Sequence, residues 1–209
     1  MFSLQTMFGK GDRFYDLLEA SAGAAQDGAK ALQALLEARG EPMLLDRFRA
    51  ARRREKELAG RISGELINTF VTALDREDIE AMSSALYRIP KTIEKFAERY
   101  AIVARRVEGI DFASRASLLM SATEGVFEMV SELRNGLSIG RMRKLQDRLQ
   151  AVEAEADRML LEPYRDLYLG SDDAIRIMLA KDLFELLEKA VDRCRDVGNV
   201  IYSIVLKNS

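Results

Sequence analysis

The sequence predicts an all-α fold of about six long helices, arranged as two tandem antiparallel three-helix bundles. Three observations lead to this prediction. Apolar residues recur at every third or fourth position over long stretches, whereas no stretch alternates as a strand does. Only 3 Pro and 13 Gly interrupt the chain, so long structureless connections are not expected. The two halves also repeat one order of elements: helix, helix, acidic cap and helix.

The first half of the chain contains three predicted helices. Gly40 and Pro42 should end the first of them, because both residues stop helices. Asp75 is expected to cap the third, since Glu77 and Asp78 then place negative charge in its first turn. Pro90 should kink that helix. The helices are expected over about residues 12–39, 43–72 and 76–107.

The second half contains three more predicted helices. Asp111 should cap the fourth helix, Gly170 should end the fifth, and Asp173 belongs to the acidic start of the sixth. The fourth helix is expected to end at about residue 134 and the sixth at about residue 206. The fifth is expected over about residues 140–169.

An internal repeat divides the chain. The third and sixth helices align with an offset of 101, which pairs Leu86 with Leu187 and Ala97 with Gly198. We therefore expect one three-helix bundle over residues 1–108 and a second over residues 109–209.

Composition excludes several function classes. The formal net charge is −2 and Lys/Arg runs are short, so nucleic acid is not an expected partner. The chain has no histidine, which removes imidazole as a base, nucleophile or metal ligand. The one cysteine, Cys194, fits a reducing compartment. We expect the protein in the cytoplasm, including the inner face of the membrane, because no stretch of about 18 apolar residues is present.

Acidic residues form a stripe on the last helix. Glu188, Asp192 and Asp196 follow one another at intervals of four, and like charges at this spacing repel by roughly 0.2–0.5 kcal/mol per pair. One explanation is a solvent-exposed face with weak ion pairs, for which Lys189 and Arg195 are suitably spaced. The other is that the carboxylates bind a cation.

A second acidic pair favours the interpretation that these carboxylates bind a cation. Glu153 and Asp157 lie four apart on the fifth helix, which neighbours the sixth in an antiparallel bundle. These two could meet Glu188 and Asp192, and a hard cation needs such a group of oxygen ligands. The alternative is a pair of solvated acids near arginines.

Four segments of the chain carry a resemblance to a known family. VEAEADRMLLEPYRDLY, LFELLEKAVDRCRDVGNVIYSIVLKNS and the acidic cap FVTALDREDIEAM resemble the PhoU-like accessory proteins of Pit-type inorganic phosphate transporters. The opening GKGDRFYDLLEASAGAAQDGAKAL fits the first helix of that family. The resemblance implies two three-helix bundles, each with a Glu/Asp-x-x-x-Asp metal motif, and clusters of a metal such as iron or zinc.

The two halves match that family motif unequally. The second half keeps acids at the motif positions, and the resemblance makes them candidate ligands of iron, zinc or manganese: Glu153, Asp157, Glu188, Asp192 and Asp196. The first half has Lys56, Gly60, Tyr87, Lys91 and Lys95 at the corresponding places. Protonated lysines repel cations, so we expect no metal in the first half.

The resemblance implies an accessory or regulatory protein that docks on a Pit-type phosphate transporter from the cytoplasm. A metal-free helical scaffold, forming homo-oligomers through its amphipathic helices, is the alternative. An enzyme is not expected, because the sequence shows no nucleophile–base pair and no phosphate-binding glycine loop; GKG at residues 9–11 lacks the full spacing of such a loop.

Overall fold

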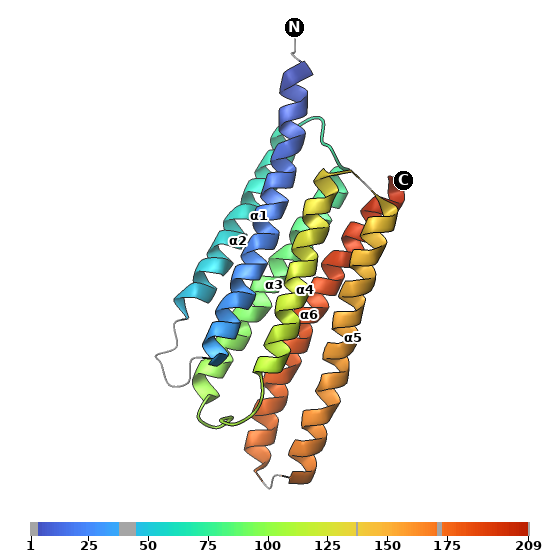
Figure 1. Cartoon of the computed structure of the whole chain (residues 1–209). Coiled ribbons are helices and arrows are strands. Elements are labelled where there is room, and N and C mark those ends of the chain that lie inside the picture. Colours follow the sequence, from blue (N-terminus) through green and yellow to red (C-terminus); the bar gives the residue numbers. More distant parts are fainter. Residues whose placement is uncertain (1–3, 38–44, 137, 171–172, 209) are drawn as a thin grey trace.

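A computed structural model describes residues 4–37, 45–136, 138–170 and 173–208. Six helices form an elongated bundle in which successive helices run in opposite directions (Figure 1). Their bounds are α1 Leu4–Glu37, α2 Asp46–Asn68, α3 Arg76–Val103, α4 Ala113–Arg134, α5 Ile139–Gly170 and α6 Ala174–Lys207. The predicted all-α class and the two antiparallel groups of three helices are confirmed.

Helix ends follow the predicted caps in the second half. Asp111 accepts a hydrogen bond from the Ser114 backbone N–H at 3.1 Å, just before α4 begins. Asp173 accepts one from the Arg176 backbone N–H at 3.0 Å at the start of α6. These aspartates stabilise helix starts by binding N–H groups that have no partner within the helix.

Three predicted boundaries in the first half are corrected. α2 ends at Asn68 and not near residue 72. α1 begins at Leu4 and not near residue 12, so a helix runs through the glycines there. α3 ends at Val103 and not near residue 107, because the following residues form turns that lead to Gly109, whose φ is +83°. A left-handed backbone of this kind cannot continue a helix.

The two groups of helices share one core. Helices α1–α3 pack against one another, as do α4–α6, and the groups meet through α1 on α4 and α3 on α6. The buried apolar residues form a single continuous cluster across all six helices. The division into domains at residue 108 stays a prediction.

Aromatic side chains join the groups at one end of the bundle. The Phe112 ring, which precedes α4, lies 5.9 Å from Phe96 and 5.8 Å from Tyr100 between ring centroids. Its centroid is 4.8 Å from that of Phe184 on α6. Phe112 therefore connects α3 of the first group to α6 of the second.

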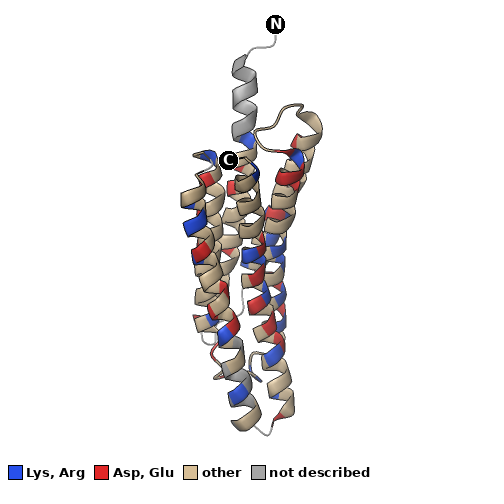
Figure 2. Ribbon diagram, turned by 90° about the vertical axis from the view of Figure 1, so that its right-hand side faces the viewer, with Lys and Arg blue, Asp and Glu red and all other residues tan. Residues whose placement is uncertain are grey.

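Charged residues of both signs are distributed along the helices (Figure 2). Two ion pairs fix the antiparallel register between the groups. Lys207 near the end of α6 binds Asp78 near the start of α3 at 2.6 Å, and Arg134 at the end of α4 binds Glu19 of α1 at 3.0 Å. In the described part of the chain, no helix is long and apolar enough to cross a membrane.

Candidate metal site

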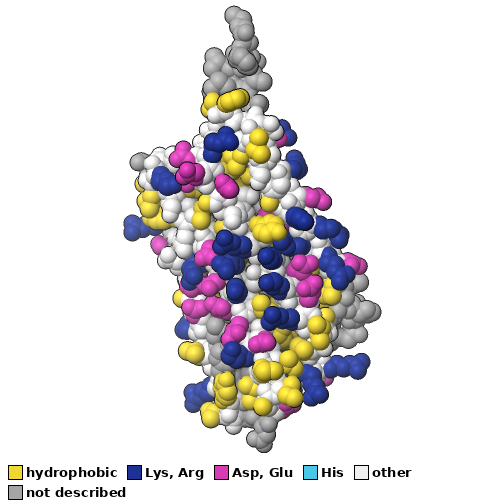
Figure 3. Space-filling view, turned by 180° about the vertical axis from the view of Figure 1, so that it is seen from behind, with side chains coloured by type: hydrophobic (Ala, Val, Ile, Leu, Met, Phe, Trp, Pro, Cys, Tyr) yellow, Lys and Arg dark blue, Asp and Glu magenta, His cyan; other side chains and the backbone are white. Residues whose placement is uncertain are grey.

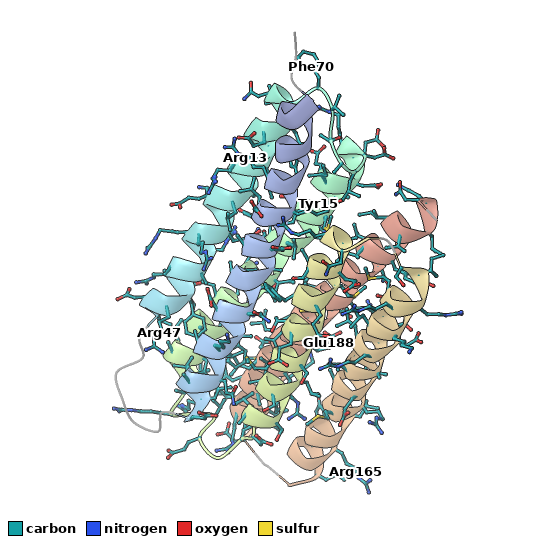
Figure 4. All side chains as sticks on the ribbon, turned by 45° about the horizontal axis from the view of Figure 1, so that its top comes forward. Arg13, Tyr15, Arg47, Phe70, Arg165 and Glu188 are labelled. Carbon is teal, nitrogen blue, oxygen red and sulfur yellow. The ribbon has the colours of Figure 1, made fainter. Side chains whose placement is uncertain are left out.

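The structure places the five predicted metal ligands along the junction of α5 and α6. Asp157 is exposed, whereas the other four acids are half-buried. Figure 4 shows Glu188 within the group of helices that includes α4 and α5. The pairing of these two helices in the structure therefore agrees with the arrangement expected from the sequence.

Arginine side chains form ion pairs with three of the five acids. Arg195 of α6 binds Glu153 across the helix junction and also binds Asp192 at 2.9 Å. Arg193 binds Asp196 at 2.7 Å. The guanidinium of Arg195 thus lies where a cation bridging Glu153 and Asp192 would have to be, and it neutralises both carboxylates.

Glu188 is less well neutralised than its neighbours. Its pKa is raised from 4.5 to about 7, chiefly by burial and also by the negative charges of Asp192 and Asp157, while Arg195 acts in the opposite direction. The side chain lines a cavity of about 10 Å³ between α4, α5 and α6, which is about the space that one water needs. The negative charges of Asp157 and Asp192 therefore both act on the Glu188 carboxylate.

The geometry does not fit a metal as the side chains stand. Within the described ranges, no group of three or more Asp, Glu, Cys or His side chains is arranged to hold a metal ion. Arg195 binds both Glu153 and Asp192, so a metal would have to displace it to reach these two carboxylates. The metal site stays a prediction.

Sequence reasoning missed Arg115, the buried arginine beside this site. Its guanidinium donates to the Asp111 carbonyl at 2.9 Å and to the Met159 carbonyl of α5, and it lies 4.4 Å above the Phe184 ring of α6. Arg115 thereby ties α4 to both helices of the acidic junction. No local sequence signal could reveal it, because Met159 is 44 residues away.

The first-half positions that correspond to the acids of α5 and α6 carry no carboxylates. Lys56, Lys91 and Lys95 are exposed, and the guanidinium of Arg52 lies 3.8 Å above the Tyr87 ring. The absence of metal from the first half stays a prediction.

Gly198 allows α5 and α6 to approach closely next to the acidic junction. A Cβ atom at this position would lie 2.6 Å from Leu149 Cδ2 and 2.7 Å from Gln146 Oε1, and both of those side chains are buried. We expect Gly198→Ala to lower the free energy of unfolding by about 1–3 kcal/mol through overpacking.

Gly60→Ala is the matched control for Gly198→Ala. A Cβ atom there meets nothing within 4 Å, so this change should raise stability by roughly 0.5–1 kcal/mol through helix propensity. Urea denaturation measures both. Equal effects of the two substitutions would show that α5 and α6 do not need the glycine.

Comparison with known proteins agrees with this architecture. The chain is 25% identical over 203 residues to a proposed pit accessory protein from Rhizobium meliloti (strain 1021), covering 94% of each chain. It is 21% identical over 148 residues to the UPF0111 protein YkaA from Bacillus subtilis (strain 168), covering 69% of this chain and 70% of YkaA. No protein-family model matches the chain.

Crystal structures of PhoU-like proteins share the fold. A PhoU-like protein from Shewanella oneidensis MR-1 matches with a TM-score of 0.79 at 15% identity, covering 93% of this chain and 99% of that one. PhoU from Pseudomonas aeruginosa matches with a TM-score of 0.70 at 17% identity, covering 96% and 99%. The resemblance of this chain to the PhoU-like family, with its Pit accessory proteins, is thereby confirmed.

Proposed function

We propose that this protein is a cytoplasmic accessory protein of inorganic phosphate transport that docks on a Pit-type membrane transporter. The observation that carries the proposal is the likeness to a proposed pit accessory protein over 94% of both chains. The shared fold with PhoU-like proteins supports the same role.

The proposal assigns no catalytic residue. The chain has no histidine, and its one cysteine, Cys194, is buried, which raises the pKa of the thiol and keeps it protonated. The carboxylates at the α5–α6 junction are bound largely by arginines. The residues therefore support binding and regulation better than turnover.

Co-purification tests the docking. The tagged protein is expected to enrich a Pit-type transporter from detergent extracts relative to an unrelated membrane protein of similar abundance. Equal recovery of both membrane proteins would contradict the proposal.

A second proposal is that the acidic junction binds iron, zinc or manganese when Arg195 is displaced. It is supported by the carboxylates of Asp157 and Asp192, whose negative charges raise the pKa of Glu188. Glu153 and Asp196 would be additional ligands once their arginines move. A metal and Arg195 should then compete for the same oxygens.

Metal content should follow that competition. We expect Arg195→Gln to bind more metal than the wild type, because it frees Glu153 and Asp192, and we expect Asp157→Asn/Asp192→Asn to bind less. Plasma mass spectrometry of protein purified without a metal column gives the metal-to-protein ratio. Glu155→Gln, which removes an exposed acid from α5, is the control.

If all four proteins carry no metal while remaining folded, the metal proposal is wrong. The alternative is then a metal-free scaffold, for which self-association is the relevant property. Exposed apolar side chains, among them Phe70 and Leu169, could form such contacts. Light scattering of the purified protein distinguishes a monomer from a homo-oligomer.

A further inference from the structure

A cluster of exposed cations lies on the face formed by α3 and α6. Arg88, Lys91 and Lys95 follow one another at intervals of three and four residues on α3 and are all exposed, so they share one side of that helix over about 10 Å. Lys189 is an exposed cation of α6. Figure 3 shows basic side chains gathered over the middle of the face seen from behind, where α3 and α6 lie. We call these four residues the basic face.

The register of the two helices brings the four residues together. The ion pair between Asp78 and Lys207 aligns the start of α3 with the end of α6. Counting along the two antiparallel helices from this pair places Lys95 level with Lys189. The two halves of the chain thus contribute to the same charged surface.

The basic face has no acidic partners within the described part of the chain. None of its four residues forms an ion pair there. Two of the nearby acids are directed elsewhere, since Glu94 binds Arg52 and Asp196 binds Arg193. Cations that lie close together without forming ion pairs repel one another, and an anionic partner would relieve that repulsion.

Apolar side chains extend the same face toward one end of the bundle. Ile102 of α3 is 84% exposed and Met178 of α6 is 56% exposed. Apolar side chains appear below the basic residues in Figure 3. The surface therefore combines a cationic centre with an apolar edge, a combination that suits an acidic polypeptide carrying a large apolar side chain.

We propose that the basic face of Arg88, Lys91, Lys95 and Lys189 is the surface that docks on the transporter, where it binds an acidic cytoplasmic segment. This inference rests on the proposed function. A polypeptide segment suits the face better than a lipid surface does, because exposed Glu98 and Glu185 border the cations. A planar anionic membrane would press against those acids as well, whereas a segment of helix width contacts the cations alone.

The test compares two triple substitutions that change net charge equally. Lys91→Gln/Lys95→Gln/Lys189→Gln removes three charges from the basic face. Arg53→Gln/Lys56→Gln/Arg61→Gln removes three exposed charges from α2 that also form no ion pair with any described residue. Binding of each protein is measured to a Pit-type transporter in zwitterionic nanodiscs, and circular dichroism verifies that each variant is folded.

We expect the basic-face variant to bind at least about tenfold more weakly than the wild type and the α2 variant to bind within about twofold of it. Equal binding of the two variants would overturn the inference while leaving the proposed function intact. Loss that appears only in nanodiscs containing anionic phosphatidylglycerol would assign the face to lipid headgroups and also overturn it. If the wild type itself does not bind, the proposed function fails and the inference fails with it.

Discussion

Replacement of Phe112 by alanine should lower the free energy of unfolding by about 3–5 kcal/mol. The side chain is 2% exposed and contacts three further aromatic rings, on α3 and α6. Its removal leaves a cavity where the two groups of helices meet and also removes the specific attraction between the rings. Urea denaturation followed by circular dichroism measures the loss.

Phe70→Ala is the matched control for Phe112→Ala. Phe70 is fully exposed in the connection between α2 and α3, and Figure 4 places its side chain at the end of the bundle. Its removal should change stability by less than about 0.5 kcal/mol. A loss below about 1 kcal/mol for Phe112→Ala would show that the two groups of helices do not depend on the aromatic contact.

Neutralising Glu55 should stabilise the protein by up to about 3 kcal/mol at pH 8 and have little effect near pH 4.5. Glu55 of α2 is fully buried. Burial raises its pKa from 4.5 to about 7, although the Ser21 hydroxyl, which donates to it at 2.5 Å, and the charges of Arg52 and Arg54 act in the opposite direction. Its second carboxylate oxygen has no hydrogen-bond partner among the residues that the structure describes.

The sign of the pH dependence follows from proton binding. Because the pKa of Glu55 is higher in the folded than in the unfolded state, the folded protein binds the proton more tightly. The contribution of Glu55 protonation to the free energy of unfolding is fully present below about pH 4.5 and is lost as the pH rises to about 7. Glu55→Gln mimics the protonated side chain at every pH, so its advantage should appear over that interval.

Thermal denaturation between pH 4.5 and pH 8 tests this expectation. Glu57→Gln, which changes an exposed acid two residues away on the same helix, should show no comparable pH-dependent gain. A Glu55→Gln variant that is less stable than the wild type at pH 8 would contradict the account. It would mean that the folded state needs the ionised carboxylate.

The fold was predictable because the helix signals are local. The apolar period along the helices and the caps at Asp111 and Asp173 can be read within short windows of sequence. The early start of α1 was missed, because Gly9 and Gly11 have low helix propensity and the helix nevertheless includes them.

The details of the candidate site depend on contacts between distant residues. Arg195 is three residues from Asp192, so that ion pair could be anticipated, but its bond to Glu153 spans 42 residues. Glu55 lies in a run of charged residues that reads as a solvent-exposed face, yet packing against α1 buries it. Periodicity can place residues on one helix face, but it cannot predict which neighbouring cation will form an ion pair with a given carboxylate.

Phosphate uptake tests the central claim most directly. Cells that express a Pit-type transporter are compared with and without this protein, using radioactive phosphate and an unrelated transporter as the control. The account predicts that the protein changes the initial rate of phosphate uptake on the order of twofold or more and leaves the control transporter unaffected. Identical phosphate uptake with and without the protein, at equal transporter abundance, would contradict the account.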